Sequence, residues 1–333
     1  MLVGIAASAR FAKGKTKFAG KQGGNKHSVL RPLLRFVAFA QFIAYHPSMD
    51  TSLTPFVPYL ERWNLEVDGS VITRKTSSLL PVHRDGIPLI LKVSQREDDV
   101  RGYALLDSWA GRGCVRVLQH DGAAALMERA PDGTGLYALT GTEEGDDEAS
   151  RILCATLKTL HTNQNTNYPE QLIPLFVWFR DLEANADTYG GIFPMCRSYA
   201  RSLLSSQQEV IPLHGDLNHG NVLNFGEQRG WLAIDPVALL GESGFEYGVL
   251  FSNPELRTPC IQSRFHRQLA VVLQVTQQEP RRLLMWIAAQ AGLSAIWFCL
   301  DGEPDMAERG MTVAAIAHNA LAGTALPPEL SSS

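Results

Sequence analysis

Three polar side chains near the middle of the chain have the types and the spacing that phosphoryl transfer requires. Asp216 and Asn221 are five residues apart in "HGDLNHGNVL", and Asp235 ends the apolar segment "WLAID". In such a set one carboxylate orients an attacking hydroxyl, while an amide oxygen and a second carboxylate hold Mg²⁺ against nucleotide phosphates. An Asp and an Asn at this spacing occur by chance about once in a chain this long, so their context must decide.

The residues between Asn221 and Asp235 must bring these two side chains together. The segment "VLNFGEQRGWLAID" has two short apolar runs separated by a turn that contains Gly, a pattern typical of a hairpin. A hairpin would return Asp235 to the level of Asn221. The sequence therefore predicts that both side chains lie at the open end of one hairpin.

A lysine upstream suggests where phosphates would bind. Lys92 lies inside the apolar run "LILKVS", where a charged group is costly unless it meets an anion such as a phosphate. The alternative is a lysine on an edge strand with its head in solvent. Its expected partner is an acid on the next helix, Asp99, with Glu97 and Asp98 as alternatives, although acids favour a helix's first turn anyway.

A second feature upstream is a polar turn in "KTSSLL", which contains Ser77 and Ser78. Backbone N–H groups and hydroxyls at a β-turn can cover phosphates. The alternative is that these are ordinary turn residues.

The composition limits the classes of partner. The net charge is −4 and 45% of the residues are hydrophobic, which gives no reason to expect nucleic acid as a partner. Five cysteines occur singly, so we expect no disulfide framework and a cytoplasmic location. The apolar stretch 281–300 is interrupted by Gln290, and we expect a buried helix there and no membrane span.

The chain begins with a basic extension. Residues 1–48 contain eight of the 30 Lys and Arg residues and none of the 34 acids. A transit peptide would be richer in Arg and Ser, and a basic tail for anionic surfaces is an alternative. We expect residues 1–48 to be disordered and to lie outside the fold, which would begin at Met49.

The remaining chain divides into two parts and predicts an α+β fold. Residues 49–130 read as about five antiparallel strands with one helix, "REDDVRGYALLDSWAGRG". Residues 131–333 are mainly helical, with apolar residues at helical spacing. We expect the first part to bind nucleotide and the second to carry the catalytic loop and bind the acceptor.

Taken together, the motifs resemble a known family. "HGDLNHGNVL", "WLAIDP", "LILKVS" and "ALMERA" are similar to aminoglycoside phosphotransferases, whose two-lobed fold is protein-kinase-like. "AIDPVALLGESGFEYGVLFSNP" and "PRRLLMWIAAQAGLSAIWFCLDGE" resemble the streptomycin 6-kinase and hydroxyurea kinase branch. The resemblance runs from about residue 50 to residue 322.

The resemblance implies ATP and Mg²⁺ as cofactors, and a role for each matching residue. The implied roles are catalysis by Asp216, Mg²⁺ binding by Asn221 and Asp235, α/β-phosphate binding by Lys92, and adenine binding by the backbone from Glu128 to Ala130. Asp99 stands where the family pattern leads us to look for a Glu, which leaves the partner of Lys92 open.

The acceptor is expected to be a small, cationic molecule. Trp297, Asp301 and Glu303 in "IWFCLDGE" are candidates for its pocket, because acids suit a cation and an aromatic wall suits a sugar ring. The alternative is a core Trp followed by a helix end. The oligomeric state is not predicted.

We therefore expect ATP-dependent O-phosphorylation of an aminoglycoside such as streptomycin. Alternatives are a kinase of hydroxyurea or of an endogenous sugar or amino alcohol. A nucleotide-binding pseudokinase scaffold is a third hypothesis, which the presence of Lys92, Asp216, Asn221 and Asp235 disfavours.

Overall fold

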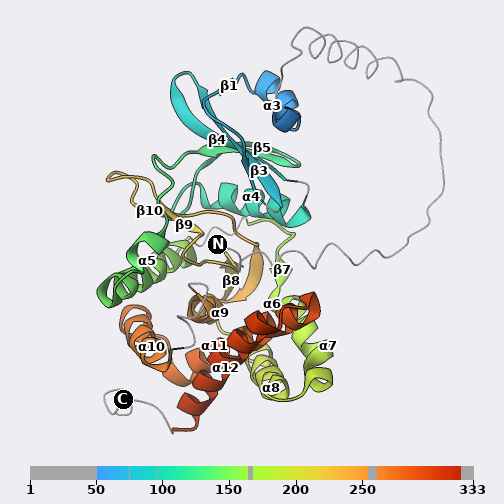
Figure 1. Ribbon diagram of the computed structural model, residues 1–333, viewed down its shortest axis with the longest axis vertical. Helices are drawn as coiled ribbons and strands as arrows, with labels where there is room; N and C mark the ends of the chain where they lie inside the picture. The colour runs from blue at the N-terminus through green and yellow to red at the C-terminus, as the bar shows by residue number, and fades with distance from the viewer. Residues whose placement is uncertain (1–50, 75, 95, 164–167, 254–260, 324–333) are drawn as a thin grey trace, which may run out of the picture.

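The chain folds into two lobes, a sheet-rich one and a helical one (Figure 1). The computed structural model describes residues 51–74, 76–94, 96–163, 168–253 and 261–323. The predicted disorder of residues 1–48 concerns residues outside these ranges. The α+β arrangement agrees with the prediction from sequence.

The first lobe is built on a six-stranded antiparallel sheet with the order β1-β3-β4-β6-β5, in which β2 also pairs with β3. Asp85 and Gly86, with φ of 53° and 76°, form the two-residue turn between β3 and β4, as a tight hairpin requires. The strands are β1 (Glu66–Val67), β2 (Ile72–Thr73), β3 (Ser77–Arg84), β4 (Ile87–Ser94), β5 (Val117–Asp121) and β6 (Ala124–Glu128).

Two helices accompany this sheet, α3 (Val57–Arg62) and α4 (Glu97–Trp109), and a 3-10 turn, η2 (Thr51–Leu53), precedes them. The sequence predicted about five strands and one helix for this lobe. In the part of the chain that the structure describes, the lobe has one more strand and one more α-helix than predicted. The missed elements are β1 and α3, and the reason is length: β1 has two residues and α3 has six, too few for periodicity to be recognised.

The second lobe packs around α11, which contacts α12, α8 and α9 most extensively. α11 is long and apolar enough to cross a membrane, with a mean hydropathy of 1.8, but 78% of that window is buried within the protein. This fits the buried helix expected from the sequence. The α-helices are α5 (Glu143–His161), α6 (Leu175–Trp178), α7 (Arg180–Tyr189), α8 (Phe193–Ser205), α9 (Gly244–Val249), α10 (Gln262–Thr276), α11 (Pro280–Asp301) and α12 (Pro304–Leu321), and the 3-10 turns are η3 (Leu136–Leu139) and η4 (Leu250–Ser252).

Two small sheets lie on the side of the helical lobe that faces the sheet-rich lobe (Figure 1). β9 (Val222–Asn224) and β10 (Trp231–Ala233) form the hairpin expected from the sequence. β11 (Leu239–Glu242) pairs with β7 (Ile173–Pro174) and β8 (Val210–Leu213). The Asp216 loop follows β8, and Asp235 lies between β10 and β11, so these sheets position both carboxylates.

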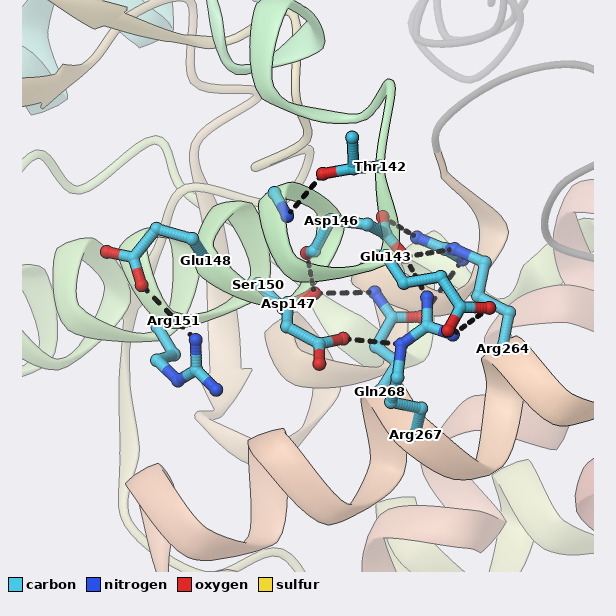
Figure 2. A network of polar contacts seen from close by, with 11 residues as sticks. Thr142, Glu143, Asp146, Asp147, Glu148, Ser150, Arg151, Arg264, Arg267 and Gln268 are labelled. Carbon is cyan, nitrogen blue, oxygen red and sulfur yellow. Dashed lines mark hydrogen bonds and ion pairs between the residues drawn. The ribbon is translucent and has the colours of Figure 1, made fainter.

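A buried ionic network joins α5 to α10 (Figure 2). The Arg264 guanidinium donates to both carboxylate oxygens of Asp146, at 2.8 and 2.9 Å. Arg267 donates to Asp147 at 2.6 Å and to Asp146 at 3.1 Å. Because both partners of the Arg264–Asp146 pair are almost fully buried, neither charge is left to solvent.

We expect Arg264→Met to lower the free energy of unfolding by about 3 kcal/mol, because it leaves a buried carboxylate with only part of its compensation. Arg151→Met is the control, since Arg151 pairs with Glu148 on the surface and such pairs contribute less than about 1 kcal/mol. Urea unfolding measures both variants. Equal losses would show that the buried network stabilises no more than a surface pair.

Candidate active site

Lys92 lies on β4 with its ammonium group between two carboxylates. Its Nζ is 2.7 Å from Oδ1 of Asp99 and 2.9 Å from Oδ1 of Asp235, and the residue is 3% exposed. Burial by itself would lower the pKa of Lys92, but the attraction of Asp235 and Asp99 outweighs it and the pKa is raised. Lys92 is therefore a charged group that joins β4, α4 and the segment after β10.

Of the three acids considered as partners of Lys92, the structure places Asp99 beside it. Asp98 instead pairs with Arg96 at 2.7 Å and also with Arg101. Ser94, which sequence reasoning missed, lies with its Oγ 2.5 Å from Oδ2 of Asp99. A buried serine beside a charged strand residue offers little signal in the sequence.

Ser77 and Ser78 begin β3, directly across from Ser94 and Val93 on β4. The preceding turn is closed by the Arg74 N–H, which donates to the Ser77 carbonyl at 2.8 Å. Ser94 Oγ also lies 3.1 Å from the Thr76 carbonyl oxygen. The turn is thus held near the end of the strand that carries Lys92.

The loop after β8 surrounds Asp216 with two side-chain amides. Asn221 Nδ2 donates to the Asp216 carbonyl at 2.8 Å and lies 3.3 Å from Oδ2, while Asn218 Nδ2 lies 3.2 Å from Oδ1. Burial raises the pKa of Asp216 to about 7, although the hydrogen bonds from Asn218 and Asn221 act in the opposite direction. Asp216 therefore changes its protonation state near neutral pH.

The hairpin brings Asn221 and Asp235 to the same level, as predicted. The Ile234 N–H donates to the Asn221 carbonyl at 2.9 Å, continuing the pairing of β9 with β10. Asp235 follows with a φ of 56°, a left-handed conformation that Asp tolerates better than most residues. Its side chain is 42% exposed, so it remains accessible to solvent.

His214 holds the loop to the segment that ends at Asp235. Its Nε2–H donates to the Ile234 carbonyl at 2.8 Å, and its Nδ1 accepts from the Asp216 N–H at 3.3 Å. Burial lowers the pKa of His214, which keeps the ring neutral, as this pair of hydrogen bonds requires. The ring therefore orients the loop and takes no proton.

Glu246 on α9 anchors the same loop through the Gly215 N–H. Its Oε1 accepts from the Gly215 N–H at 2.8 Å, and its Oε2 lies 2.7 Å from Nε2 of His161. Gly215 has a φ of 86°, and an added Cβ would lie 2.7 Å from Cγ of Leu239. Sequence reasoning missed Glu246; an acid in the apolar stretch "FEYGVLF" was the available signal.

Glu128 and Ala130 lie at the end of β6, where the chain passes between the lobes. The Glu128 carboxylate accepts from the Arg116 N–H at 2.7 Å and from Arg229 Nη2 at 2.6 Å. The Glu128 N–H donates to the Arg116 carbonyl at 3.1 Å. Glu128 therefore uses its side chain and its N–H within the protein, and a nucleobase would meet the neighbouring backbone.

The three acceptor candidates are in different environments. Trp297 is 3% exposed, packs edge-on against Trp178 at 5.1 Å, and donates its indole N–H to Asp181 at 2.9 Å. This burial favours the core alternative for Trp297 over an aromatic wall. Asp301 and Glu303 are exposed, at the end of α11 and before α12. Asp181, which sequence reasoning did not single out, lies beside Trp297.

The arrangement suits a divalent cation bound together with phosphates. Asn221 and Asp235 provide the oxygen donors that Mg²⁺ prefers. Among the described residues, no group of three or more His, Cys, Asp or Glu side chains could hold a metal ion. Two protein ligands fit a Mg²⁺ site that phosphate oxygens and water complete.

Fold and site together define the class, which is a small-molecule kinase with a protein-kinase-like fold. Two solved structures share the fold. One is a thermostable mutant of aminoglycoside phosphotransferase APH(4)-Ia with AMP-PNP and hygromycin B (TM-score 0.57, 14% identity, 79% of this chain and 98% of that chain). The other is choline kinase LicA from Streptococcus pneumoniae (TM-score 0.54, 14% identity, 82% and 100%).

Residues 62–302 match the family described as aminoglycoside/hydroxyurea antibiotic resistance kinase, and the chain belongs to this family. It is 45% identical to a streptomycin 3''-kinase from Klebsiella pneumoniae (73% of this chain, 92% of that protein). It is 33% identical to the hydroxyurea phosphotransferase of Kitasatospora aureofaciens (78% and 76%). It is 29% identical to the streptomycin 6-kinase of Streptomyces griseus (77% and 85%). The predicted family, fold class and enzyme class are confirmed.

We expect Glu246→Ala to lower the free energy of unfolding by about 2–4 kcal/mol, because the buried Gly215 N–H and His161 would lose their partner. Glu246→Gln is the matched control, since its amide oxygen can accept from Gly215 and its NH₂ can donate to His161. Guanidinium unfolding with parallel turnover assays measures both. An alanine variant as stable as the glutamine variant would exclude this anchoring role.

Proposed function

We propose that this kinase transfers the γ-phosphoryl group of ATP to streptomycin at the 3''-hydroxyl. The observation that carries the proposal is that Lys92 Nζ lies within 2.9 Å of carboxylate oxygens of both Asp99 and Asp235. These groups lie near the loop that contains Asp216. Support for the acceptor is the 45% identity to a streptomycin 3''-kinase over 92% of its length. The identity to the streptomycin 6-kinase is 29%, which favours the 3''-position.

In this proposal the phosphates and the adenine of the nucleotide bind to different segments of the protein. Lys92, held by Asp99, binds the α- and β-phosphates, and the turn before Ser77 and Ser78 covers them. The backbone from the Glu128 carbonyl to the Ala130 N–H receives the adenine edge. When bound, Mg²⁺ neutralises charge on the β- and γ-phosphates, and Asn221 and Asp235 are the residues that would hold it.

Asp216 is the group that handles the proton. Its carboxylate accepts a hydrogen bond from the acceptor hydroxyl and takes the proton as the oxygen bonds to the γ-phosphorus. The bond between that phosphorus and the ADP oxygen breaks in the same displacement. Asn218 and Asn221 hold the carboxylate in place through hydrogen bonds to its two oxygens.

Charge complementarity supports a cationic acceptor. Asp181 lies in the first turn of α7, Asp301 is the last residue of α11, and Glu303 precedes α12. The Trp297–Asp181 hydrogen bond ties these two regions together. We propose that acidic groups here face the guanidinium groups of streptomycin, with Trp297 as a buried support and no direct contact from its ring.

A second candidate acceptor is hydroxyurea, because the chain is 33% identical to a hydroxyurea phosphotransferase. The same catalytic groups would serve both molecules, so the acceptor pocket alone distinguishes them.

We further propose a cytoplasmic location and no nucleic acid or membrane partner. The free cysteines Cys114, Cys154, Cys196 and Cys299 and the acidic net charge support this proposal.

We expect kcat/KM to fall as the pH drops through about 7. Burial raises the pKa of Asp216 to about 7, so acidification protonates the base, and activity at pH 6 should be about a tenth of the plateau above pH 8. Asp216→Asn should cost on the order of a hundredfold or more and remove this pH dependence, while ATP binding by calorimetry is largely retained. An unchanged profile in the variant would exclude Asp216 as the base.

We expect streptomycin with Mg-ATP to give a single product phosphorylated at the 3''-hydroxyl, identified by two-dimensional NMR and mass spectrometry. Hydroxyurea and a neutral sugar, assayed at equal concentration, should be turned over at least about tenfold less efficiently, because they lack the guanidinium charges. Asp216→Asn protein is the control for contaminating kinases. Phosphorylation at the 6-position, or preference for hydroxyurea, would replace the proposed acceptor assignment.

A further inference from the structure

The two ends of the β9–β10 hairpin contact different parts of the protein. Its open end presents Asn221 and Asp235, the proposed Mg²⁺ ligands. Its closed end is a tight turn, in which the Phe225 N–H donates to the Gly230 carbonyl at 2.8 Å. Arg229 lies in this turn, one residue before Gly230.

Arg229 reaches from the hairpin turn to the sheet-rich lobe. Its Nη2 lies 2.6 Å from Oε1 of Glu128, 3.1 Å from the Gly111 carbonyl and 3.4 Å from the Cys114 carbonyl. The same Glu128 oxygen accepts from the Arg116 N–H. One guanidinium therefore joins the end of β6 to the loop between α4 and β5.

The connecting segment between the lobes, residues 128–136, is attached to this hairpin at its other end as well. The Asn224 N–H donates to the Thr134 carbonyl at 3.0 Å, and Gly135 bridges to Leu223 in antiparallel fashion. The segment that would receive adenine is thus bound to the hairpin both where it starts and where it ends. The attachment at Thr134 and Gly135 is made by backbone groups. At Glu128 the Arg229 ion pair is added to backbone bonds, which join Ala233 to Gly113 and Val115 and join Arg116 to Glu128.

We propose that Arg229 is a positioning residue for the nucleotide. It holds Glu128 against the hairpin. The distance between the connecting segment and the proposed metal ligands, Asn221 and Asp235, is thereby kept constant. Adenine and the phosphates of a single ATP molecule bind at these two places, so this separation determines how well ATP fits both at once. The inference rests on the proposed use of ATP.

The alternative is that the Arg229–Glu128 pair only stabilises the fold. Its side chains are 32% and 22% exposed, so a modest stabilising effect is expected in either case. A purely structural pair would change the melting temperature and leave the affinities for ATP and for the acceptor unchanged. A positioning pair would change the affinity for ATP selectively.

The experiment uses the full chain and the variants Arg229→Met, Arg229→Lys and Glu128→Gln. Calorimetry measures the dissociation constant of Mg-ATP, and steady-state kinetics measures KM for streptomycin. We expect Arg229→Met to raise the ATP dissociation constant about tenfold, because small displacements of binding groups weaken two-point binding, and to change the streptomycin KM less than about twofold. Arg229→Lys keeps a charge near Glu128 but cannot reach both carbonyls, so an intermediate value is expected.

Arg151→Met, which removes an exposed ion pair on α5, is the matched control and should leave both constants unchanged. If Arg229→Met does not fold, Arg229→Lys decides, because Glu128→Gln keeps an amide oxygen that can accept from both Arg116 and Arg229 and removes only the charge of the pair. Unchanged ATP affinity in the folded Arg229 variants would overturn the inference. Absence of ATP binding by the unsubstituted protein would instead overturn the proposed function.

Discussion

The buried ammonium group of Lys92 is the constraint on which the rest of the site depends. An unpaired charge in this position would cost several kcal/mol, so the structure must supply anions to it from two directions. Asp99 comes from α4 and Asp235 from the end of the β9–β10 hairpin. The Lys92 ion pairs therefore join β4, α4 and the end of the β9–β10 hairpin, alongside the backbone bonds of Ala233 to Gly113 and Val115.

The groups around Asp216 are held in a different way, through buried hydrogen bonds and backbone conformation. Glu246 accepts from Gly215, and His214 spans the two strand ends. The positive φ of Asp235 is a local cost that the surrounding contacts must offset, whereas glycine at position 215 adopts a positive φ without strain. Because the loop is fixed from both sides, Asp216 keeps a half-buried position in which desolvation raises the pKa of its carboxyl group to about 7.

The proposed acceptor groups lie on other helices than the catalytic loop. The loop and hairpin lie against α9 and the small sheets, whereas Asp181, Asp301 and Glu303 belong to α7, α11 and the turn after it. Lys92 pairs with Asp99 and Asp235, whereas Asp181 accepts a hydrogen bond from Trp297. If the three acids bind the acceptor as proposed, its recognition and the catalytic groups belong to different elements.

The sequence by itself determined the class of the protein, the hairpin between Asn221 and Asp235, and most long helices, because these depend on residue type and short-range periodicity. Only the tertiary structure decided which acid meets Lys92 and that Trp297 is a core residue. It also placed Ser94 beside Asp99, Glu246 beside Gly215 and Arg229 beside Glu128. Each of these is a contact between residues distant in sequence or on different elements. Local patterns suggested an acid near Lys92 but could not choose among Glu97, Asp98 and Asp99, because burial and partner choice arise only when the elements pack together.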